Sequence, residues 1–176
     1  YGDFYTQQGY YLASPADHIT LHPVGTVDFR GFASYVPFFK GLLDKIGIDM
    51  QIYYAGNFKS ATEPFRRTEM SPENKLQTRE YLTDTYDMYL QDIADARQIN
   101  VDSLKNMAWQ FQIKSADDAL RYKLVDEIGA KADCESWMNE KMGKGQNDRI
   151  TYTNIEEYAS ATPLHQTNLK AKDKIA

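Results

Sequence analysis

The sequence has little cysteine and no long apolar run. Its single cysteine, Cys134, cannot form a disulfide within the chain. No stretch of about 18 apolar residues is present, and the first residues lack the charged, apolar and small-residue blocks of a secretory signal. These residues are therefore not expected to cross a membrane or to direct export by themselves.

Histidine is also scarce, with His18, His22 and His165 as its only positions. No nucleophile-elbow sequence accompanies them, which argues against a Ser-His-Asp triad. His18 and His22 are four residues apart, but Pro23 and the strand-like pattern between them remove the helical face on which that spacing would serve a metal. We expect no zinc site.

Clustered basic residues are missing as well. The chain carries 20 Lys and Arg against 25 Asp and Glu, for a net charge of −5. Nucleic-acid binding relies on grouped Lys and Arg that contact phosphates, and the basic residues here are scattered. No nucleic-acid partner is expected. The 13 tyrosines and 8 phenylalanines are abundant by contrast, and are expected mostly in the core.

Apolar spacing and turn residues predict an α/β architecture. Ser71 followed by Pro72 is a good start for a long helix, with proline at the first helical position. We predict helices over 6–14, 35–46, 71–97, 102–111, 115–122 and 134–142, with caps at Asp102 and Ser115, and strands over 19–21, 26–29 and 50–55.

The chain is expected to consist of a domain over 1–142 and a linker over 143–176. The polar, glycine-containing segment 143–148 separates them, and 149–152 is considered as an added strand. The chain begins without methionine, and 172–176 reads as the start of a new strand. The sequence is therefore expected to be part of a longer protein.

Lys59 follows the predicted strand 50–55 in a short loop flanked by aromatic and apolar residues. An amine serves as a general base near neutral pH only when burial or nearby positive charge lowers its pKa from about 10.4 to roughly 7 to 8. Spacing alone also fits a solvated loop lysine with no chemical role. Lys59 is the candidate catalytic residue.

The charged neighbours of Lys59 leave two arrangements open. Glu63 lies four residues further on and could pair with Lys59, which would oppose base function. Arg66 and Arg67 could engage Glu63 instead and leave Lys59 free. Ser60 is interpreted as either a positioning hydroxyl or a helix cap.

The lysine segment 57–65, NFKSATEPF, resembles the lysine motif of the signal peptide peptidase A family, in its long form built from two homologous halves. The family belongs to the crotonase and Clp-protease superfamily, whose fold stacks β-β-α units with flanking helices. The resemblance covers about residues 1 to 131. Other stretches agree in the same order: 8–17 (QGYYLASPAD), 27–32 (VDFRGF), 71–73 (SPE), 113–120 (IKSADDAL) and 124–129 (LVDEIG).

Gln7 is the main departure from the family pattern. In the catalytic half of the family, a serine followed by two small residues precedes the aromatic pair, and here that position is Gln7. The chain therefore resembles the amino-terminal half, which supplies the lysine while the second half supplies the serine. A smaller departure, 121–123 (RYK) before the LVD segment, concerns local packing.

The resemblance implies a membrane-associated bacterial serine peptidase that degrades residual signal peptides by a Ser-Lys dyad. Lys59 would accept the proton of a serine outside residues 1–176, which alone are expected to be inactive. Such a dyad needs no cofactor. The implied partners are apolar signal-peptide-like substrates, the second half of the protein and further copies in a ring-like homo-oligomer. A membrane segment outside this chain and a catalytic part outside the cytoplasm are also implied.

Two other functions remain open. In the first, loss of the nucleophile at Gln7 went with loss of catalysis, and the chain is a scaffold or oligomerisation domain of the same peptidase. In the second, the chain is an acyl-CoA enzyme of the crotonase type. The second rests on fold analogy alone, because the sequence supplies no evident CoA site.

Overall fold

A computed structural model describes residues 1–145 and 148–161. The chain divides into two compact units, Tyr1–Cys134 and Glu135–Ala176. The described residues form α1 (Gln7–Ala13), β1 (Thr20–Leu21), α2 (Lys40–Lys45), the 3-10 helix η1 (Ser60–Thr62), α3 (Glu63–Arg66), α4 (Pro72–Arg97), α5 (Val101–Trp109), α6 (Ala116–Arg121), β2 (Glu127–Ile128), α7 (Lys131–Lys141) and α8 (Ile155–Ser160).

Helix α4, with 26 residues, is the longest element of the first unit. Its start is as predicted: the Ser71 hydroxyl accepts the backbone N–H of Asn74 at 3.1 Å, and Pro72 occupies the first turn, where its missing N–H is not needed. Only the carboxyl-terminal half of the helix buries large apolar side chains, including Leu90 and Ile93. The hydrophobic core therefore lies against that half.

The two strands form a small parallel sheet. Thr20 in β1 pairs with Glu127 in β2, and isolated bridges join Gly2 to Leu21 and Tyr5 to Val27. The described part of the chain is thus a mixture of many helices and few strands. The stacked β-β-α units stay a prediction.

A hydrophobic core lies between this sheet and the carboxyl-terminal half of α4. Tyr10 of α1 is fully buried and makes edge-to-face contacts with the rings of Tyr5 and Phe29. Burial of these apolar side chains is the main force that holds α1, α4, α5 and α6 together. The largest buried apolar side chains are Tyr10, Ile19, Leu21, Val27, Leu90, Ile93, Leu104, Leu124 and Val125.

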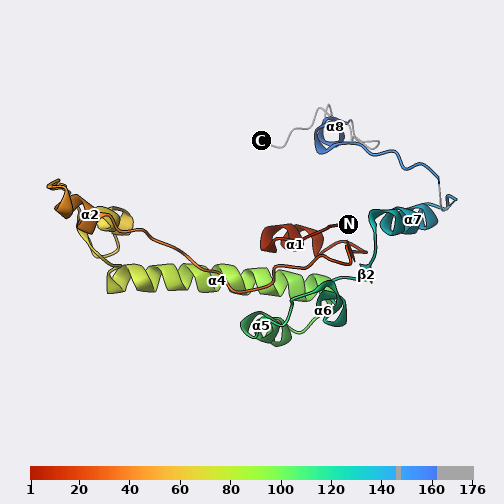
Figure 1. The fold of residues 1–176 in the computed structure, drawn as a ribbon, viewed down its shortest axis with the longest axis horizontal. Coiled ribbons are helices and arrows are strands. Elements are labelled where there is room, and N and C mark those ends of the chain that lie inside the picture. The colour runs from red at the N-terminus through yellow and green to blue at the C-terminus, as the bar shows by residue number, and fades with distance from the viewer. Residues whose placement is uncertain (146–147, 162–176) are drawn as a thin grey trace, which may run out of the picture. The chain divides into compact units, whose positions relative to one another are not determined.

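Two groups of elements lie at different positions along α4 (Figure 1). Helix α2 lies near the amino-terminal end, and α1, α5 and α6 lie along the carboxyl-terminal half. Contacts agree with this view, because Glu63 of α3 binds Asn74 in the first turn of α4, whereas Tyr11 of α1 binds Asp92 near the other end. The lysine segment therefore belongs to the amino-terminal group.

The segment 50–55, predicted as a strand before Lys59, is not a strand. Within the described residues it makes no backbone–backbone hydrogen bond, and Tyr53 and Tyr54 are 94% and 56% exposed. Apolar alternation favours a strand only where a second strand completes the ladder of hydrogen bonds. The prediction was wrong because no such partner lies beside 50–55 in the described part of the chain.

Other elements differ from their predicted ranges at one or both ends. The predicted strand 26–29 provides only the bridge at Val27, and the helix predicted over 35–46 forms only as α2. Helix α5 is capped by Asn100, whose side chain accepts the backbone N–H groups of Asp102 and Ser103, and not by Asp102. Asn100, two residues before the predicted cap, can reach these donors because the capping residue directly precedes the first helical residue, Val101.

In the second unit, helix α8 begins with a capping box. The Asn154 side chain accepts the backbone N–H of Glu157, and the Glu157 side chain accepts the backbone N–H of Asn154. Residues 149–152 form no strand, so that suggestion was wrong. The predicted boundary between 142 and 143 stays a prediction, and His165 lies outside the described residues.

Candidate functional site

Lys59 lies in the turn that leads into η1, with its side chain exposed. Its backbone N–H donates to the carbonyl of Gly56 at 3.4 Å, and Gly56 has a φ of +90° that only glycine adopts without strain. The sharp turn at Gly56 therefore determines where the chain places Lys59.

Aromatic and small side chains form an open hollow around Lys59, with a volume of about 520 Å³. Phe58, beside the lysine, is 57% exposed. The hollow can present an amine beside apolar surface. Its lining consists of Tyr53, Tyr54, Ala55, Phe58, Lys59, Ser60, Ala61 and Thr62.

Glu63 does not pair with Lys59. Its side chain is fully buried, and its Oε2 accepts the backbone N–H of Ser71 at 3.1 Å and the Asn74 side-chain amide at 2.8 Å. Burial alone would raise the pKa of Glu63, but these hydrogen bonds and the charge of Arg66 hold the pKa below its ordinary value. Glu63 is therefore a buried carboxylate anchored to the start of α4.

Arg66 is the cation that faces Glu63. Its guanidinium lies 3.6 Å from Glu63 Oε1, donates to the Thr62 hydroxyl at 3.2 Å and stacks 3.8 Å from the ring centre of Tyr54. Arg67 turns away and donates to the Glu69 carbonyl. Of the two arrangements left open by the sequence, the described residues show the one in which Arg66 engages Glu63 and no carboxylate forms an ion pair with Lys59.

Gln7 is the first helical residue of α1, whose amino-terminal cap is Thr6. It borders a second hollow of about 1050 Å³, whose lining includes Tyr11, Leu12, Phe32 and Tyr89. The buried side-chain oxygen of Gln7 has no hydrogen-bond partner in the described residues. A carboxamide cannot attack a peptide carbonyl as a serine hydroxyl can, so this position supplies no nucleophile.

The segments that carry Gln7 and Lys59 are held at different points along α4. The Tyr89 hydroxyl donates to the Gln7 carbonyl at 3.5 Å, whereas the lysine segment is tied through Glu63 to Asn74. The fifteen residues from Asn74 to Tyr89 correspond to roughly 22 Å of helix, at about 1.5 Å per residue. The described chain therefore does not bring the lysine and the Gln7 position together.

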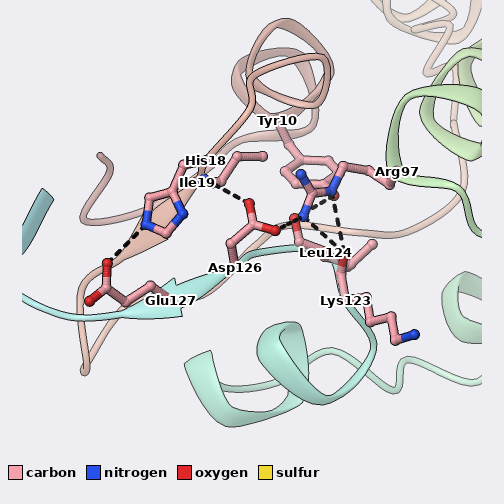
Figure 2. Close-up of polar contacts among 8 residues, drawn as sticks. All are labelled: Tyr10, His18, Ile19, Arg97, Lys123, Leu124, Asp126 and Glu127. Atoms are coloured by element: carbon pink, nitrogen blue, oxygen red, sulfur yellow. Dashed lines mark hydrogen bonds and ion pairs between the residues drawn. The ribbon is translucent and has the colours of Figure 1, made fainter. Parts of the chain in front are cut away.

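A polar cluster joins the closing segment 123–127 to α4 and β1 (Figure 2). Asp126 lies between Arg97, whose guanidinium is 2.6 Å away, and the backbone N–H of Ile19, which donates at 2.8 Å. The Tyr10 hydroxyl donates to the Leu124 carbonyl at 2.7 Å. The cluster fixes α1, and with it Gln7, against the core.

No group of His, Cys, Asp and Glu suited to a metal ion occurs among the described residues. Within the same residues, no helix combines the length and apolar character required to span a bilayer. Neither His18 nor His22 joins such a group. His18 instead lies 2.9 Å from the Glu127 carboxylate.

Sequence reasoning missed three contributors to the lysine site. Ser71 and Asn74 bind Glu63 from the next helix, and Tyr54 stacks on Arg66. Asn74 lies 11 residues beyond Glu63 and in a different helix, so no periodic pattern within one element could indicate the contact.

Comparison with known proteins identifies the family. The model of "Peptidase family S49" matches residues 1–144. "Protease 4" of Haemophilus influenzae is 31% identical over 183 residues, covering 100% of this chain and 30% of the relative. "Protease 4" of Salmonella typhi is 33% identical over 175 residues, covering 92% of this chain and 28% of the relative. "Putative signal peptide peptidase SppA" of Enterococcus faecium is 26% identical over 155 residues, covering 88% of this chain and 42% of the relative.

The chain spans less than a third of the length of either Protease 4. The resemblance to the amino-terminal half of the long-form family, drawn from the motif at Lys59 and the departure at Gln7, is confirmed by these matches. The match also runs from the first residue through the whole first unit. The chain belongs to peptidase family S49.

Proposed function

We propose that this chain contributes the general-base lysine to a serine peptidase that degrades residual signal peptides. Lys59 would accept the proton of a serine outside residues 1–176 as that serine attacks the peptide carbonyl. Backbone amides outside the chain would stabilise the oxyanion. The chemistry requires neither cofactor nor metal.

One observation carries the proposal: Lys59 lies in a turn and lines an open aromatic hollow, and the nearest acidic residue in sequence, Glu63, binds other partners. A lysine bound to a carboxylate would hold its proton more tightly. The apolar lining also suits apolar substrates, because contact with them removes aromatic surface from water.

The separation of Lys59 from Gln7 supports a site shared between two parts of the protein. The segments that carry Gln7 and Lys59 are tied to α4 at Tyr89 and Asn74, two points roughly 22 Å apart along the helix at about 1.5 Å per residue, whereas a proton transfer needs hydrogen-bond contact. This separation supports the proposal that the serine that uses Lys59 approaches from outside this chain, from the second half or a neighbouring copy.

The test is hydrolysis of an apolar leader-like peptide by the complete protein with Lys59→Ala. We expect at least about a 1000-fold loss of kcat, in the range for removal of one member of a catalytic unit. Lys59→Arg should lose activity as well, because a guanidinium keeps its proton. Lys45→Ala, which removes another exposed lysine, is the matched control.

The alternative is a scaffold domain of the same peptidase, favoured by Gln7 at the nucleophile position. It predicts near-normal turnover of Lys59→Ala at matched folding and oligomeric state. That result would place the base in another part of the protein and leave this chain a role in assembly.

The remaining expectations follow from the same proposal. We propose that the complete protein is anchored in the bacterial membrane by a segment outside this chain, with its catalytic part outside the cytoplasm. We also propose that copies assemble into a homo-oligomer, and that the complete protein has the stacked β-β-α units of its superfamily.

A further inference from the structure

We propose that Glu63 and Arg66 form a positioning pair that fixes the turn carrying Lys59 and balances the charge beside it. Neither residue would touch substrate. The catalytic consequence rests on the proposed role of Lys59, whereas the effect on the Lys59 amine can be measured without activity.

Glu63 ties the lysine turn to α4. Its carboxylate reaches the Ser71 backbone N–H and the Asn74 amide, the two residues that also form the helix cap. The short helices η1 and α3 follow directly on Lys59, so the position of Glu63 restricts where the lysine can lie. Loss of this anchor would release the turn from the end of α4.

Arg66 ties the same turn to the hollow. Its guanidinium bridges the Glu63 carboxylate at 3.6 Å and the Thr62 hydroxyl at 3.2 Å, and it covers the Tyr54 ring at 3.8 Å. Tyr54 and Thr62 both line the hollow that holds Lys59. The Arg66 side chain thus connects the buried Glu63 carboxylate to two residues that line the hollow, Thr62 and Tyr54.

The two charges compensate each other. Glu63 Oε1 is buried and accepts no hydrogen bond in the described residues, and Arg66 is the cation that faces it. A buried carboxylate without a counter-charge is costly, and an uncompensated charge acts strongly on neighbouring titratable groups. Removal of either partner should therefore leave one unbalanced charge beside the lysine turn.

Other charged groups of the packed elements are engaged or exposed. Lys40 and Asp44 of α2 pair with each other at 2.8 Å, and Glu69 pairs with Lys75 at 3.4 Å. Exposed charges are screened by solvent and act weakly at a distance. Lys45 of α2, Arg67 after α3 and Glu73 in the first turn of α4 are further charged residues of the same elements.

The pair predicts opposite effects of two substitutions. Arg66→Gln leaves the negative Glu63, which should favour the protonated Lys59 amine and move its titration to higher pH. Glu63→Gln leaves the positive Arg66 and should move the titration to lower pH. Each shift should be roughly a few tenths of a pH unit, because the charges of Glu63 and Arg66 are largely buried whereas solvent screens the exposed Lys59.

Acetylation of the complete protein by an amine-reactive reagent across a pH series, read by mass spectrometry, measures the neutral fraction of Lys59. The Lys45 peptide in the same digest is the internal reference, and Glu69→Gln is the control for loss of an exposed carboxylate. Arg66→Lys should restore the wild-type midpoint, because it keeps the charge. Urea unfolding of each variant checks that the fold is retained.

Opposite shifts with rescue by Arg66→Lys would support the pair. Unchanged midpoints, or shifts in the same direction for both variants, would overturn it, since a purely structural role does not depend on the sign of the lost charge. Peptide hydrolysis by Lys59→Ala judges the proposed function separately. Full activity of that variant would defeat the catalytic role of Lys59 while the acetylation result still decides the pair.

Discussion

Arg97 and Asp126 form an ion pair at 2.6 Å that connects the end of α4 to the segment before β2. Asp126 also accepts the Ile19 N–H, so one carboxylate holds three parts of the chain. Burial alone would raise the pKa of Asp126, yet Arg97 and Ile19 hold this pKa below its ordinary value. Asp126 therefore stabilises the fold more when it is ionised than when it is protonated.

The first prediction concerns the pH dependence of this cluster. The folded pKa of Asp126 lies below the unfolded value of about 3.9, so its contribution is present above about pH 4 and is lost as pH falls through the folded pKa. Asp126→Asn should cost about 1 to 3 kcal/mol at pH 7. Urea unfolding at pH 7 and in a descending pH series measures it.

Asp84→Asn is the matched control, because Asp84 is an exposed residue of the same long helix. Its stability should stay within about 0.5 kcal/mol of the wild type. If the difference between wild type and Asp126→Asn did not shrink at low pH, the ionised cluster would not be its cause.

The second prediction concerns the buried hydroxyl of Tyr10. Its hydrogen bond to the Leu124 carbonyl links α1 to the closing segment, and burial raises its pKa, so it stays a donor at all ordinary pH values. Tyr10→Phe keeps the ring contacts but leaves the carbonyl unpaired, and should cost about 1 to 3 kcal/mol. Tyr53→Phe, at a side chain that is 94% exposed, should have no measurable effect in the same urea titration.

The third prediction concerns the cap of α4. Ser71→Ala removes the hydroxyl that accepts the Asn74 N–H and should lower stability by about 0.5 to 2 kcal/mol. The hydrogen bond that the backbone N–H of residue 71 donates to the Glu63 carboxylate would remain. Ser103→Ala, in an exposed position near the start of α5, should be close to neutral. Thermal unfolding followed by circular dichroism compares the two variants.

The sequence is a good guide where local chemistry decides the structure. Ser71 and Pro72 specify the start of α4, and Ser115 caps α6 as predicted, since both signals act within one helical turn. It is a poor guide where a distant partner decides. Residues 50–55 have the alternation of a strand but no ladder partner in the described chain.

The candidate site shows the same division. The competition between Lys59 and Arg66 for Glu63 could be predicted, because these residues lie within one short segment. The fixation of Glu63 by Asn74 could not, because it depends on how α3 meets the first turn of α4. Packing between α3 and α4, rather than spacing along the chain, therefore determines that Glu63 does not pair with Lys59.

The fourth prediction follows from the separation of Gln7 and Lys59 along α4. Gln7→Ser restores a hydroxyl at the nucleophile position, but Tyr89 holds that position far from the segment that Asn74 anchors. Residues 1–176 with Gln7→Ser should therefore hydrolyse an apolar leader-like peptide no faster than the unaltered chain, which should itself be inactive. A fluorescent probe that reacts with activated serines should leave both unlabelled. Turnover by the variant that is abolished by a further Lys59→Ala would show that one chain can assemble the dyad, and the shared site would have to be abandoned.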